Sequence, residues 1–413
     1  MANRNYLLTS TRAMDRCRAI KDLAKNYDNS YLSILENIAL NDDSSIVRCE
    51  AISAIGRQRD FNNISFLINT LRDNDPKIVC QAIRGLLVFK GDNNVDNSLE
   101  QLKYHPNELV KEIILKEYFS DEKTTKKISH TQTYDFLKNV VVNADVSDVL
   151  KLLPRESIHL TFTSPPYYNA RDYSIYQSYD EYLDFLEEVF FEIERVTKEG
   201  RFLIVNTSPI IIPRVSRQHS SKRYPIPFDL HARLVNIGWE FIDDIVWEKP
   251  EFSVKNRIGG FQQHRKPLGY KPNAVTEYLM VYRKKTDKLL DWNIHQYSDD
   301  VVEESKVNGD FETTNVWKIS PKSDKIHSAV FPMELCKRVI QYYSYKGDLV
   351  FDPFAGSGTL QRTARAMDRY AFSSEREKKY FDYMKDLEKG NTFFDEKEIK
   401  YLTLEQFKKT IEQ

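Results

Sequence analysis

The feature that most constrains this chain is a short apolar strand that ends at two consecutive prolines. Ile158–Phe162 reads as a buried strand, and Thr163-Ser164-Pro165-Pro166-Tyr167 follows it directly. Proline has no backbone N–H to donate and restricts the residue before it, so neither a ladder nor a helix continues through this pair. We therefore expect a rigid corner at the carboxyl end of a strand, where open α/β sheets bind their ligands.

A second stretch, much later in the chain, has the order strand, turn and helix. Leu349–Phe351 reads as a buried strand, Asp352–Gly358 as a turn, and the residues after Thr359 as a helix. Gly356 and Gly358 let the backbone approach a ligand closely, and a helix that begins there points its N–H groups at that ligand. This order predicts a ligand-binding turn at the end of a strand.

Two acids are suited to hold the rest of such a ligand. Asp352 ends the first strand and can bind an ammonium group. Glu375 follows a second expected strand, Arg369–Phe372, at the position where βαβ sites bind ribose hydroxyls. The turn is followed by no third glycine, which argues against a dinucleotide. An adenosyl ligand without a pyrophosphate fits this pattern better.

Composition narrows the class of protein. The chain of 413 residues is long enough for two or three domains, and its net charge of −1 means that any nucleic-acid surface must be a local patch. The four cysteines form no CxxC pair and no His/Cys cluster, so we expect no metal site. They also suggest a reducing, cytoplasmic location. The apolar segments are too short to predict export or a membrane span.

The first part of the chain repeats itself. Val47–Ile52 aligns with Ile78–Ile83 at a shift of 31 residues, and a weaker third copy includes Leu109–Ile114. Each copy reads as two helices separated by a break, which is typical of an α-solenoid and resembles HEAT repeats. We expect residues 1–125 to form a HEAT-like domain that binds protein or nucleic acid. The alternative is a compact helical bundle.

Strands alternate with helices in the rest of the chain. A polar linker is expected at 126–133, a catalytic domain at 134–390 and a helical tail at 391–413, with a polar, irregular spacer at Thr286–Asp310. Within the catalytic domain, the amphipathic pattern of Tyr179–Val196 predicts a helix that Gly200 ends. The alternation indicates an α/β fold with a doubly wound, largely parallel, Rossmann-like sheet.

Two loops near the proline corner are basic. Pro209–Pro225 carries no acid, and Lys249–Lys271 combines basic side chains with aromatic ones. Such loops on a rigid sheet suit phosphate contacts and stacking on bases, although either loop alone is also compatible with an ordinary solvated loop. The candidate DNA-binding residues are Arg214, Arg217, Lys222, Arg223, Lys255, Arg257, Arg265 and Lys266.

Together, the two motifs resemble those of DNA amino-methyltransferases that use S-adenosyl-L-methionine. TSPPY at Thr163–Tyr167 corresponds to the catalytic motif of that family, and DPFAGSGT at Asp352–Thr359 corresponds to the cofactor motif. The catalytic motif comes first, as in the permuted β arrangement of the family. The resemblance covers roughly Val140–Lys379, and it implies a seven-stranded methyltransferase sheet closed by an antiparallel strand at Glu277–Tyr282.

The resemblance also implies roles for single residues. The catalytic residues would be Ser164, Pro165, Pro166 and Tyr167. The cofactor-binding residues would be Asp352, Pro353, Phe354, Gly356, Gly358, Thr359, Glu375, Phe331, Asp145 and Thr163. Two of these assignments have simpler alternatives, because Asp145 could cap the helix that follows it and the two glycines could serve a plain tight turn.

The chemistry of amine methylation supports this assignment independently. The lone pair of an exocyclic amine is delocalised into its ring, and acceptors at the amine hydrogens localise that pair as the sulfonium methyl approaches. The Ser164 hydroxyl and the Pro165 carbonyl are such acceptors, and Tyr167 would stack on a base swung out of the duplex. Methylation at C5 of cytosine needs a cysteine nucleophile. Since no cysteine lies near the proline corner in the sequence, we exclude that reaction.

The first residue of the SPPY tetrad bears on which base is modified. Serine there resembles the N4-cytosine enzymes, whereas aspartate or asparagine resembles the N6-adenine ones, so we expect methylation of N4-cytosine in double-stranded DNA. The expected role is modification in a restriction–modification system, with a cognate endonuclease acting on the same site. The alternatives are an N6-adenine enzyme of the same fold, an RNA or glutamine methyltransferase, and an inactive HEAT-type scaffold that only binds DNA or protein.

Overall fold

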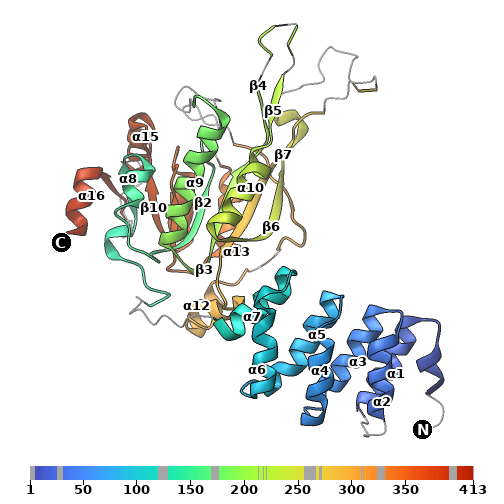
Figure 1. The fold of residues 1–413 in the computed structure, drawn as a ribbon. Helices are drawn as coiled ribbons and strands as arrows, with labels where there is room; N and C mark the ends of the chain where they lie inside the picture. Colours follow the sequence, from blue (N-terminus) through green and yellow to red (C-terminus); the bar gives the residue numbers. More distant parts are fainter. Residues whose placement is uncertain are drawn as a thin grey trace. The chain divides into compact units, whose positions relative to one another are not determined.

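The chain forms two compact units, residues 1–125 and residues 126–413, in the computed structural model (Figure 1). Each unit has a hydrophobic core of its own, with Ile52 and Ile83 fully or almost fully buried in the first and Phe162 and Phe372 in the second. The structure describes residues 5–25, 31–119, 129–168, 176–212, 214–216, 218–219, 221–254, 267–268, 272–307, 309, 311–322, 331–389 and 398–412.

The first unit consists of helices that pair along the chain. Its described α-helices are α1 (Ala13–Lys25), α2 (Leu32–Asn41), α3 (Ser45–Arg57), α4 (Ile64–Thr70), α5 (Pro76–Leu86), α6 (Asn93–Glu100) and α7 (Glu108–Phe119). The three aligned copies of the sequence repeat lie on α3, α5 and α7. Pro76 is the first residue of α5, and the Asp75 side chain caps that helix by accepting a hydrogen bond from the backbone N–H of Lys77.

An ion pair recurs with the period of the sequence repeat. Arg16 of α1 donates to Asp42 at 2.7 Å, and Arg48 of α3 forms the equivalent pair with Asp73. Each aspartate also accepts a hydrogen bond at 2.9 Å from the backbone N–H two residues further on. Asp42 and Asp73 are 31 residues apart, so the register found in the sequence corresponds to equivalent junctions between helices.

The second unit is built on a nine-stranded sheet with the order β11-β1-β10-β9-β2-β3-β7-β6-β8. Its strands are β1 (Val140–Asn143), β2 (Ile158–Thr163), β3 (Thr197–Thr207), β6 (Trp239–Glu248), β7 (Thr276–Lys284), β8 (Val316–Lys318), β9 (Leu349–Asp352), β10 (Tyr370–Ser374) and β11 (Lys400–Thr403). The seven expected strands form the centre. The expected count was too low because β11 and β8, of four and three residues, extend the two edges.

The central strands are parallel, and β7 is the exception. β1, β10, β9, β2 and β3 pair in parallel, whereas β7 pairs antiparallel with both β3 and β6. β7 therefore lies inside the sheet rather than closing it, and β6 continues to the edge strand β8.

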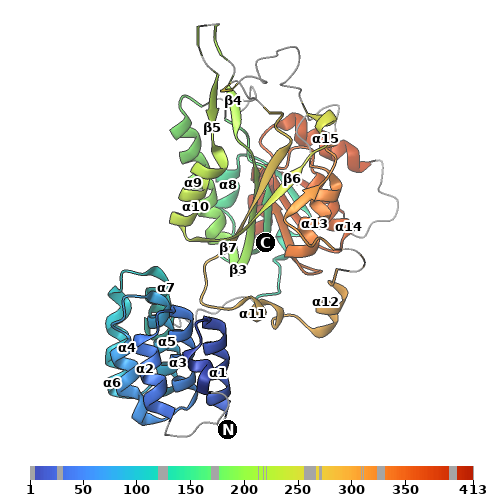
Figure 2. The same ribbon diagram turned by 90° about the vertical axis from the view of Figure 1, so that its right-hand side faces the viewer.

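Helices cover both faces of this sheet, as Figure 2 shows. One face is packed by α8 (Val146–Leu150), α9 (Tyr179–Val196), α10 (Ile226–Ile237) and α16 (Leu404–Ile411), and the other by α13 (Met333–Tyr343), α14 (Thr359–Ala366) and α15 (Lys378–Lys389). This layering is the doubly wound arrangement that the alternating pattern predicts. None of the helices in the described ranges combines the length and apolarity needed to cross a membrane.

The prediction that Gly200 ends α9 was wrong. The helix ends at Val196, β3 begins at Thr197, and Gly200 lies inside the strand with a φ of +68°. The register between β2 and β3 shifts beside it, and the Gly200 carbonyl accepts hydrogen bonds from Arg283 Nε and Asn293 Nδ2, each at 3.0 Å. A positive φ serves a strand irregularity as readily as a helix end, so the glycine alone did not distinguish them.

Three other segments contain elements that the sequence did not predict. The tail is not purely helical, because it adds β11 in parallel to β1 before α16 begins. The first basic loop holds a two-stranded antiparallel ribbon, and the spacer holds two short helices. Elements of three to six residues are too short for a periodic signal. These additional elements are β4 (Ile210–Ile212), β5 (Lys222–Tyr224), α11 (Leu290–Ile294) and α12 (Asp299–Glu304).

Candidate active site

The carboxyl ends of the parallel strands form one edge of the sheet, and both predicted motifs lie there. The chain passes from β9 to β10 on one side but from β2 to β3 on the other, so the connections diverge between β9 and β2. Such a switch point is where doubly wound sheets bind ligands. Thr163 ends β2, Asp352 ends β9, and the Thr163 hydroxyl donates to Asp352 Oδ1 at 2.8 Å. The two motifs therefore touch directly although 189 residues separate these two side chains in the sequence.

The turn after β9 uses glycines where the backbone is left-handed. Gly356 has a φ of +53° and Gly358 a φ of +71°. A Cβ added at Gly358 would lie 2.6 Å from Gln361 Nε2 and 2.7 Å from Met384 Sδ, so both conformation and space favour glycine there. α14 begins at Thr359, directly after this turn, so the N-terminus of the helix lies beside it.

Two buried carboxylates flank the turn. Asp352 accepts the hydrogen bond from Thr163 and another from the Phe354 N–H at 3.1 Å, and burial raises its pKa to about 6. Glu375 accepts from the Gly356 N–H and the Glu377 N–H, each at 2.8 Å, and burial raises its pKa to about 7. Neither carboxylate has an ion-pair partner among the residues that the structure describes. Both are therefore suited to receive the positive charge or the hydroxyls of a ligand.

The proline corner presents its polar groups beside this turn. Pro165 is buried, whereas Ser164, Pro166 and Tyr167 are half-buried at the end of β2. The Tyr167 hydroxyl donates to Glu277 Oε2 at 3.4 Å and also hydrogen-bonds with the side chains of Ser164 and Ser208. Burial, and then the negative charge of Glu277, raise the pKa of Tyr167. The phenol thus stays protonated over the whole neutral range.

Comparison with known proteins gives the family. The family model for DNA methylases of the N6/N4 type matches residues 158–386, more than half of the chain, and this range contains both motifs. The chain belongs to this family of DNA methylases.

Individual relatives agree with the family match. The methylase is 28% identical over 292 residues to the Type II methyltransferase M.Cfr9I of Citrobacter freundii, a match that covers 63% of this chain and 90% of that protein. It is 28% identical over 274 residues to M.MwoI of Methanothermobacter wolfeii, where the match covers 34% of the relative. A crystal structure titled as a putative DNA modification methylase of Thermus thermophilus, complexed with S-adenosyl-L-methionine, superposes with a TM-score of 0.50 at 23% identity. The superposition covers 64% of this chain and 97% of that one, and shows the fold.

The cofactor of the methylase is S-adenosyl-L-methionine. The residues at the switch point fit this group, because two buried carboxylates that no described cation pairs with suit its ammonium and its ribose hydroxyls, and the glycine turn leaves room for close approach. Within the described ranges, no group of three or more His, Cys, Asp or Glu side chains is arranged to hold a metal ion.

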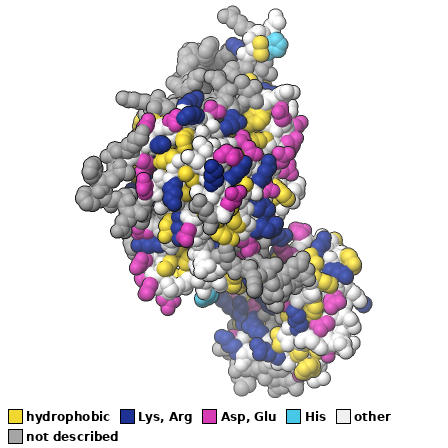
Figure 3. Space-filling model, turned by 90° about the vertical axis from the view of Figure 1, so that its left-hand side faces the viewer, with side chains coloured by type: hydrophobic (Ala, Val, Ile, Leu, Met, Phe, Trp, Pro, Cys, Tyr) yellow, Lys and Arg dark blue, Asp and Glu magenta, His cyan; other side chains and the backbone are white. Residues whose placement is uncertain are grey.

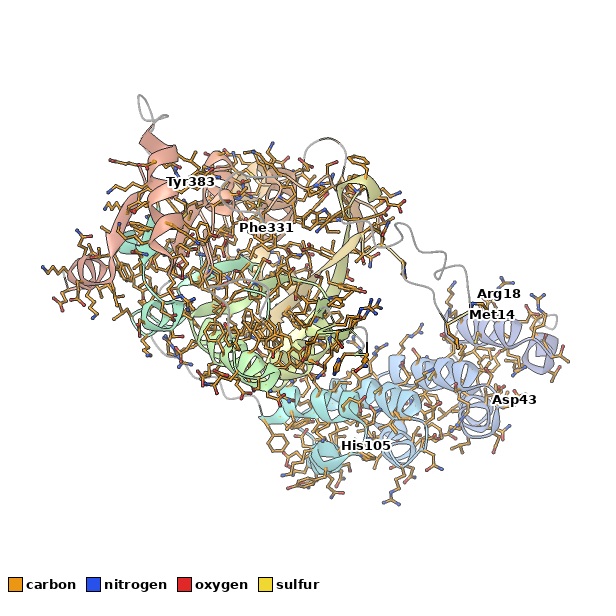
Figure 4. All side chains as sticks on the ribbon, turned by 90° about the horizontal axis from the view of Figure 1, so that it is seen from above. Met14, Arg18, Asp43, His105, Phe331 and Tyr383 are labelled. Atoms are coloured by element: carbon orange, nitrogen blue, oxygen red, sulfur yellow. The ribbon has the colours of Figure 1, made fainter. Side chains whose placement is uncertain are left out.

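Two of the predicted cofactor residues have other contacts in the structure. The Asp145 side chain caps α8 by accepting the Ser147 N–H at 3.0 Å, and Arg376 lies 3.8 Å from its second oxygen. The alternative of a helix cap is thus realised, and a contact with the cofactor stays a prediction. Phe331, labelled in Figure 4, stacks on Phe162 of β2 with ring centroids 4.5 Å apart. This stacking fixes the ring against the strand that ends at the proline corner.

The predicted DNA-binding residues are only partly described. Arg214, Lys222 and Arg223 are exposed, and the last two lie on β5 of the ribbon. Arg217, Lys255, Arg257, Arg265 and Lys266 lie outside the described residues. Figure 3 shows basic and acidic side chains interspersed on the displayed face of the catalytic unit, in line with the balanced net charge.

A cluster of tyrosines, not predicted from the sequence, ties the ribbon to the proline corner. Tyr168, the next residue after the tetrad, is buried and contacts Tyr224 of β5 and Tyr179 of α9 edge-on, with centroids at 5.0 and 5.4 Å. The ring centroids of Tyr224 and Tyr179 also lie 4.5 Å apart. In the sequence, the only indication of this cluster is that Tyr168 directly follows the tetrad. Glu277 was also missed, because its contact with Tyr167 depends on the order of strands in the sheet.

Proposed function

We propose that this DNA methylase transfers a methyl group from S-adenosyl-L-methionine to the exocyclic N4 amine of cytosine in double-stranded DNA. Ser164 carries the base assignment, because the first residue of the tetrad is serine rather than aspartate or asparagine. It follows Thr163, whose hydroxyl bonds Asp352 of the cofactor motif at 2.8 Å. This contact supports the proposal, since the amine acceptor and the cofactor turn then share one switch point.

The tetrad contributes by fixing acceptors around the amine. The bound cofactor would supply an electrophilic methyl group, whose bond to sulfur breaks as its bond to the amine nitrogen forms, with S-adenosylhomocysteine as the leaving group and one amine proton lost to solvent. Ser164 Oγ and the Pro165 carbonyl accept hydrogen bonds from the amine hydrogens and so concentrate its lone pair on nitrogen. Pro165 and Pro166 hold both acceptors in place, because proline fixes its own φ and restricts the preceding residue. Tyr167 stacks on the base, which must leave the duplex for its amine to be reached.

In this proposal, different residues bind different parts of the cofactor. Asp352 accepts the ammonium group and Glu375 the ribose hydroxyls, while the backbone from Gly356 to Gly358 approaches the ligand closely. The remaining proposed contacts are Thr163, Pro353, Phe354, Thr359, Phe331 and Asp145. Thr163 acts through Asp352, since its hydroxyl already donates to that carboxylate.

DNA binding is proposed for the ribbon and for the first unit. Lys222 and Arg223 are exposed on β5, close in sequence to Tyr224, which packs on Tyr168 next to the tetrad. The first unit, proposed as a HEAT-like domain, would add an elongated surface for DNA. A role in restriction–modification is supported by relatives named as Type II methyltransferases, M.Cfr9I among them.

The test is the identity of the methylated nucleoside. Purified protein is incubated with S-adenosyl-L-methionine labelled in its methyl group and with phage DNA from a host that lacks DNA methylases. The DNA is digested, and the nucleosides are separated under conditions that distinguish N4- from C5-methylcytosine. We expect label in N4-methylcytosine with the wild type and none with the double variant Ser164→Ala, Tyr167→Ala.

The other outcomes are equally informative. Label in N6-methyladenine would keep the fold and the tetrad's role but overturn the base assignment. No label in DNA, in a protein that still binds S-adenosylhomocysteine, would refute DNA methylation under these conditions and favour an RNA or protein substrate. A protein that binds neither the cofactor nor S-adenosylhomocysteine would favour the scaffold alternative.

A further inference from the structure

The hydroxyl of Tyr167 is tied to a strand that contributes nothing else to the proposed chemistry. It donates to Glu277 Oε2 at 3.4 Å. Glu277 lies near the start of β7, and β3 separates β7 from β2 in the sheet. The contact therefore spans three strands and joins the end of the proline corner to a carboxylate 110 residues further along the chain.

Glu277 is itself held in place by a rigid frame. Its other oxygen, Oε1, forms an ion pair with Lys249, and both side chains are only 17% exposed. The Lys249 N–H donates to the Val275 carbonyl at 2.7 Å, and its ammonium lies 4.4 Å from the centroid of the Trp247 ring. The Trp247 indole donates to the Ile319 carbonyl at 2.8 Å. The carboxylate thus has one oxygen committed to Lys249 and the other directed at Tyr167.

This arrangement limits the movement of the Tyr167 ring. A hydroxyl that is hydrogen-bonded at the far end of a phenol fixes the direction of the whole ring, because only two side-chain torsions connect it to the backbone. Hydrogen bonds in catalytic sites are often long without substrate and shorten in the complex, which fits the 3.4 Å separation here. The negative charge of Glu277 is also the largest influence after burial in keeping the phenol protonated, and hence a donor.

We propose that Glu277, paired with Lys249, is a positioning residue for methyl transfer: it orients the Tyr167 ring against the target base by accepting the hydrogen bond of its hydroxyl. Glu277 acts through Tyr167 and contacts neither the base nor the cofactor. This inference rests on the proposed function, because the ring has a base to orient only if the tetrad receives one.

The test is a double-mutant cycle on the full chain. The variants are Glu277→Gln, Tyr167→Phe and their combination, with methyl transfer measured from labelled S-adenosyl-L-methionine to unmethylated phage DNA. Both kcat and KM for DNA are determined, and the thermal shift with S-adenosylhomocysteine checks folding. Glu240→Gln is the matched control, because it makes the same chemical change at an exposed position on the neighbouring strand β6.

We expect Glu277→Gln to lower kcat by about tenfold with a much smaller change in KM, and Tyr167→Phe to lower it by a similar factor. The combined variant should be no slower than Tyr167→Phe alone, because Tyr167→Phe already removes the hydrogen bond through which Glu277 acts. Glu240→Gln should behave as the wild type. Wild-type kcat in Glu277→Gln would overturn the inference, and so would losses that multiply in the combined variant, since Glu277 would then act independently of Tyr167.

A second pair of variants covers the case in which Glu277→Gln unfolds because it leaves the Lys249 charge unpaired. Glu277→Gln with Lys249→Met removes both charges, and it is compared with the same pair in the Tyr167→Phe background. Equal rates in the two backgrounds support the inference, and a further loss on adding Tyr167→Phe contradicts it. A wild-type chain that methylates no DNA refutes the proposed function and this inference with it, whereas full activity in the Glu277 variants refutes the inference alone.

Discussion

At the scale of single residues, the proposed cofactor site contains two buried carboxyl groups beside the glycine turn, and we expect them to make cofactor binding depend on pH. Burial raises the pKa of Asp352 to about 6 and that of Glu375 to about 7. Both groups are protonated below these values and ionised above them. The ammonium group of the ligand prefers ionised Asp352, and its ribose hydroxyls donate more strongly to ionised Glu375, so binding should strengthen as the pH rises through this range.

We therefore predict that S-adenosylhomocysteine binds at least about tenfold more weakly at pH 5.5 than at pH 8. Titration calorimetry at the two pH values measures the change, and Asp352→Asn serves as the comparison in which the contribution of one carboxylate is absent. Equal affinities at both pH values would show that neither carboxylate faces the ligand.

Gly358 gives a second prediction at this scale. In Gly358→Ala, an alanine would have a φ of +71°, and its Cβ would lie 2.6 and 2.7 Å from side-chain atoms of Gln361 and Met384. We therefore expect the free energy of unfolding to fall by more than the roughly 1–2 kcal/mol that the left-handed backbone conformation alone costs. We also expect loss of the thermal shift with S-adenosylhomocysteine. Gly347→Ala is the control, because Gly347 has a φ of +83° in open space. Gly347→Ala should lower the melting temperature but keep the thermal shift with S-adenosylhomocysteine. If Gly358→Ala also kept that shift, Gly358 would have no role in binding the cofactor.

The sequence was informative about residues whose chemistry is local. Two prolines after a strand and two glycines before a helix determine the local backbone by themselves. The Thr163–Asp352 contact follows because both residues end neighbouring parallel strands. The link between Tyr167 and Glu277 could not be predicted in this way. It depends on β7 lying next to β3, which no local pattern in either segment determines.

At the scale of elements, the β4–β5 ribbon is the part of the proposed DNA surface that packs beside the proline corner. Its Lys222 and Arg223 are exposed, and Tyr224 anchors it to Tyr168 and Tyr179. We predict that Lys222→Ala with Arg223→Ala weakens DNA binding and lowers the slope of log affinity against log salt by about 1.8, from two lost phosphate contacts at about 0.9 each.

The matched control for the ribbon is Lys151→Ala, which removes an exposed charge after α8 that pairs only weakly with Asp148 at 3.4 Å. Fluorescence anisotropy of a labelled duplex over a range of salt concentrations gives the slope. An unchanged slope in the ribbon variant, or an equal change in Lys151→Ala, would remove the ribbon from the DNA surface.

The elements that the sequence did not predict are all short, whereas the longest helix was predicted in full. α9 spans the range expected from its amphipathic pattern, Tyr179–Val196, since a helix of 18 residues provides a clear period. β4, β5 and β8 have three residues each, and β11 has four, so their pairing is set by neighbours rather than by their own sequence. The tail was predicted to be only helical for the same reason. Phe407 of α16 is buried in the core of the second unit, so the helix has a clear apolar signal, but the strand before it is too short to be recognised.

At the scale of the whole molecule, the two units have separate cores, so their contributions can be separated by deletion. We predict that residues 126–413 alone keep the thermal shift with S-adenosylhomocysteine but bind DNA more weakly than the full chain. The reason is that both motifs lie in the second unit, whereas a helical repeat offers an extended binding surface. Unchanged DNA affinity and sequence preference in the shorter chain would exclude the first unit from DNA recognition.

In the proposed active site, two motifs that are distant in the sequence meet at one edge of the sheet, where the glycine turn binds the cofactor and the proline corner binds the base. Calorimetric titration of S-adenosylhomocysteine into the wild type, Asp352→Ala and Ser164→Ala tests this division between the two motifs. We expect wild-type affinity for Ser164→Ala, which should nevertheless transfer no methyl group, and at least about tenfold weaker binding for Asp352→Ala. Equal affinity in all three proteins would contradict the assignment of the turn after β9 as the cofactor site.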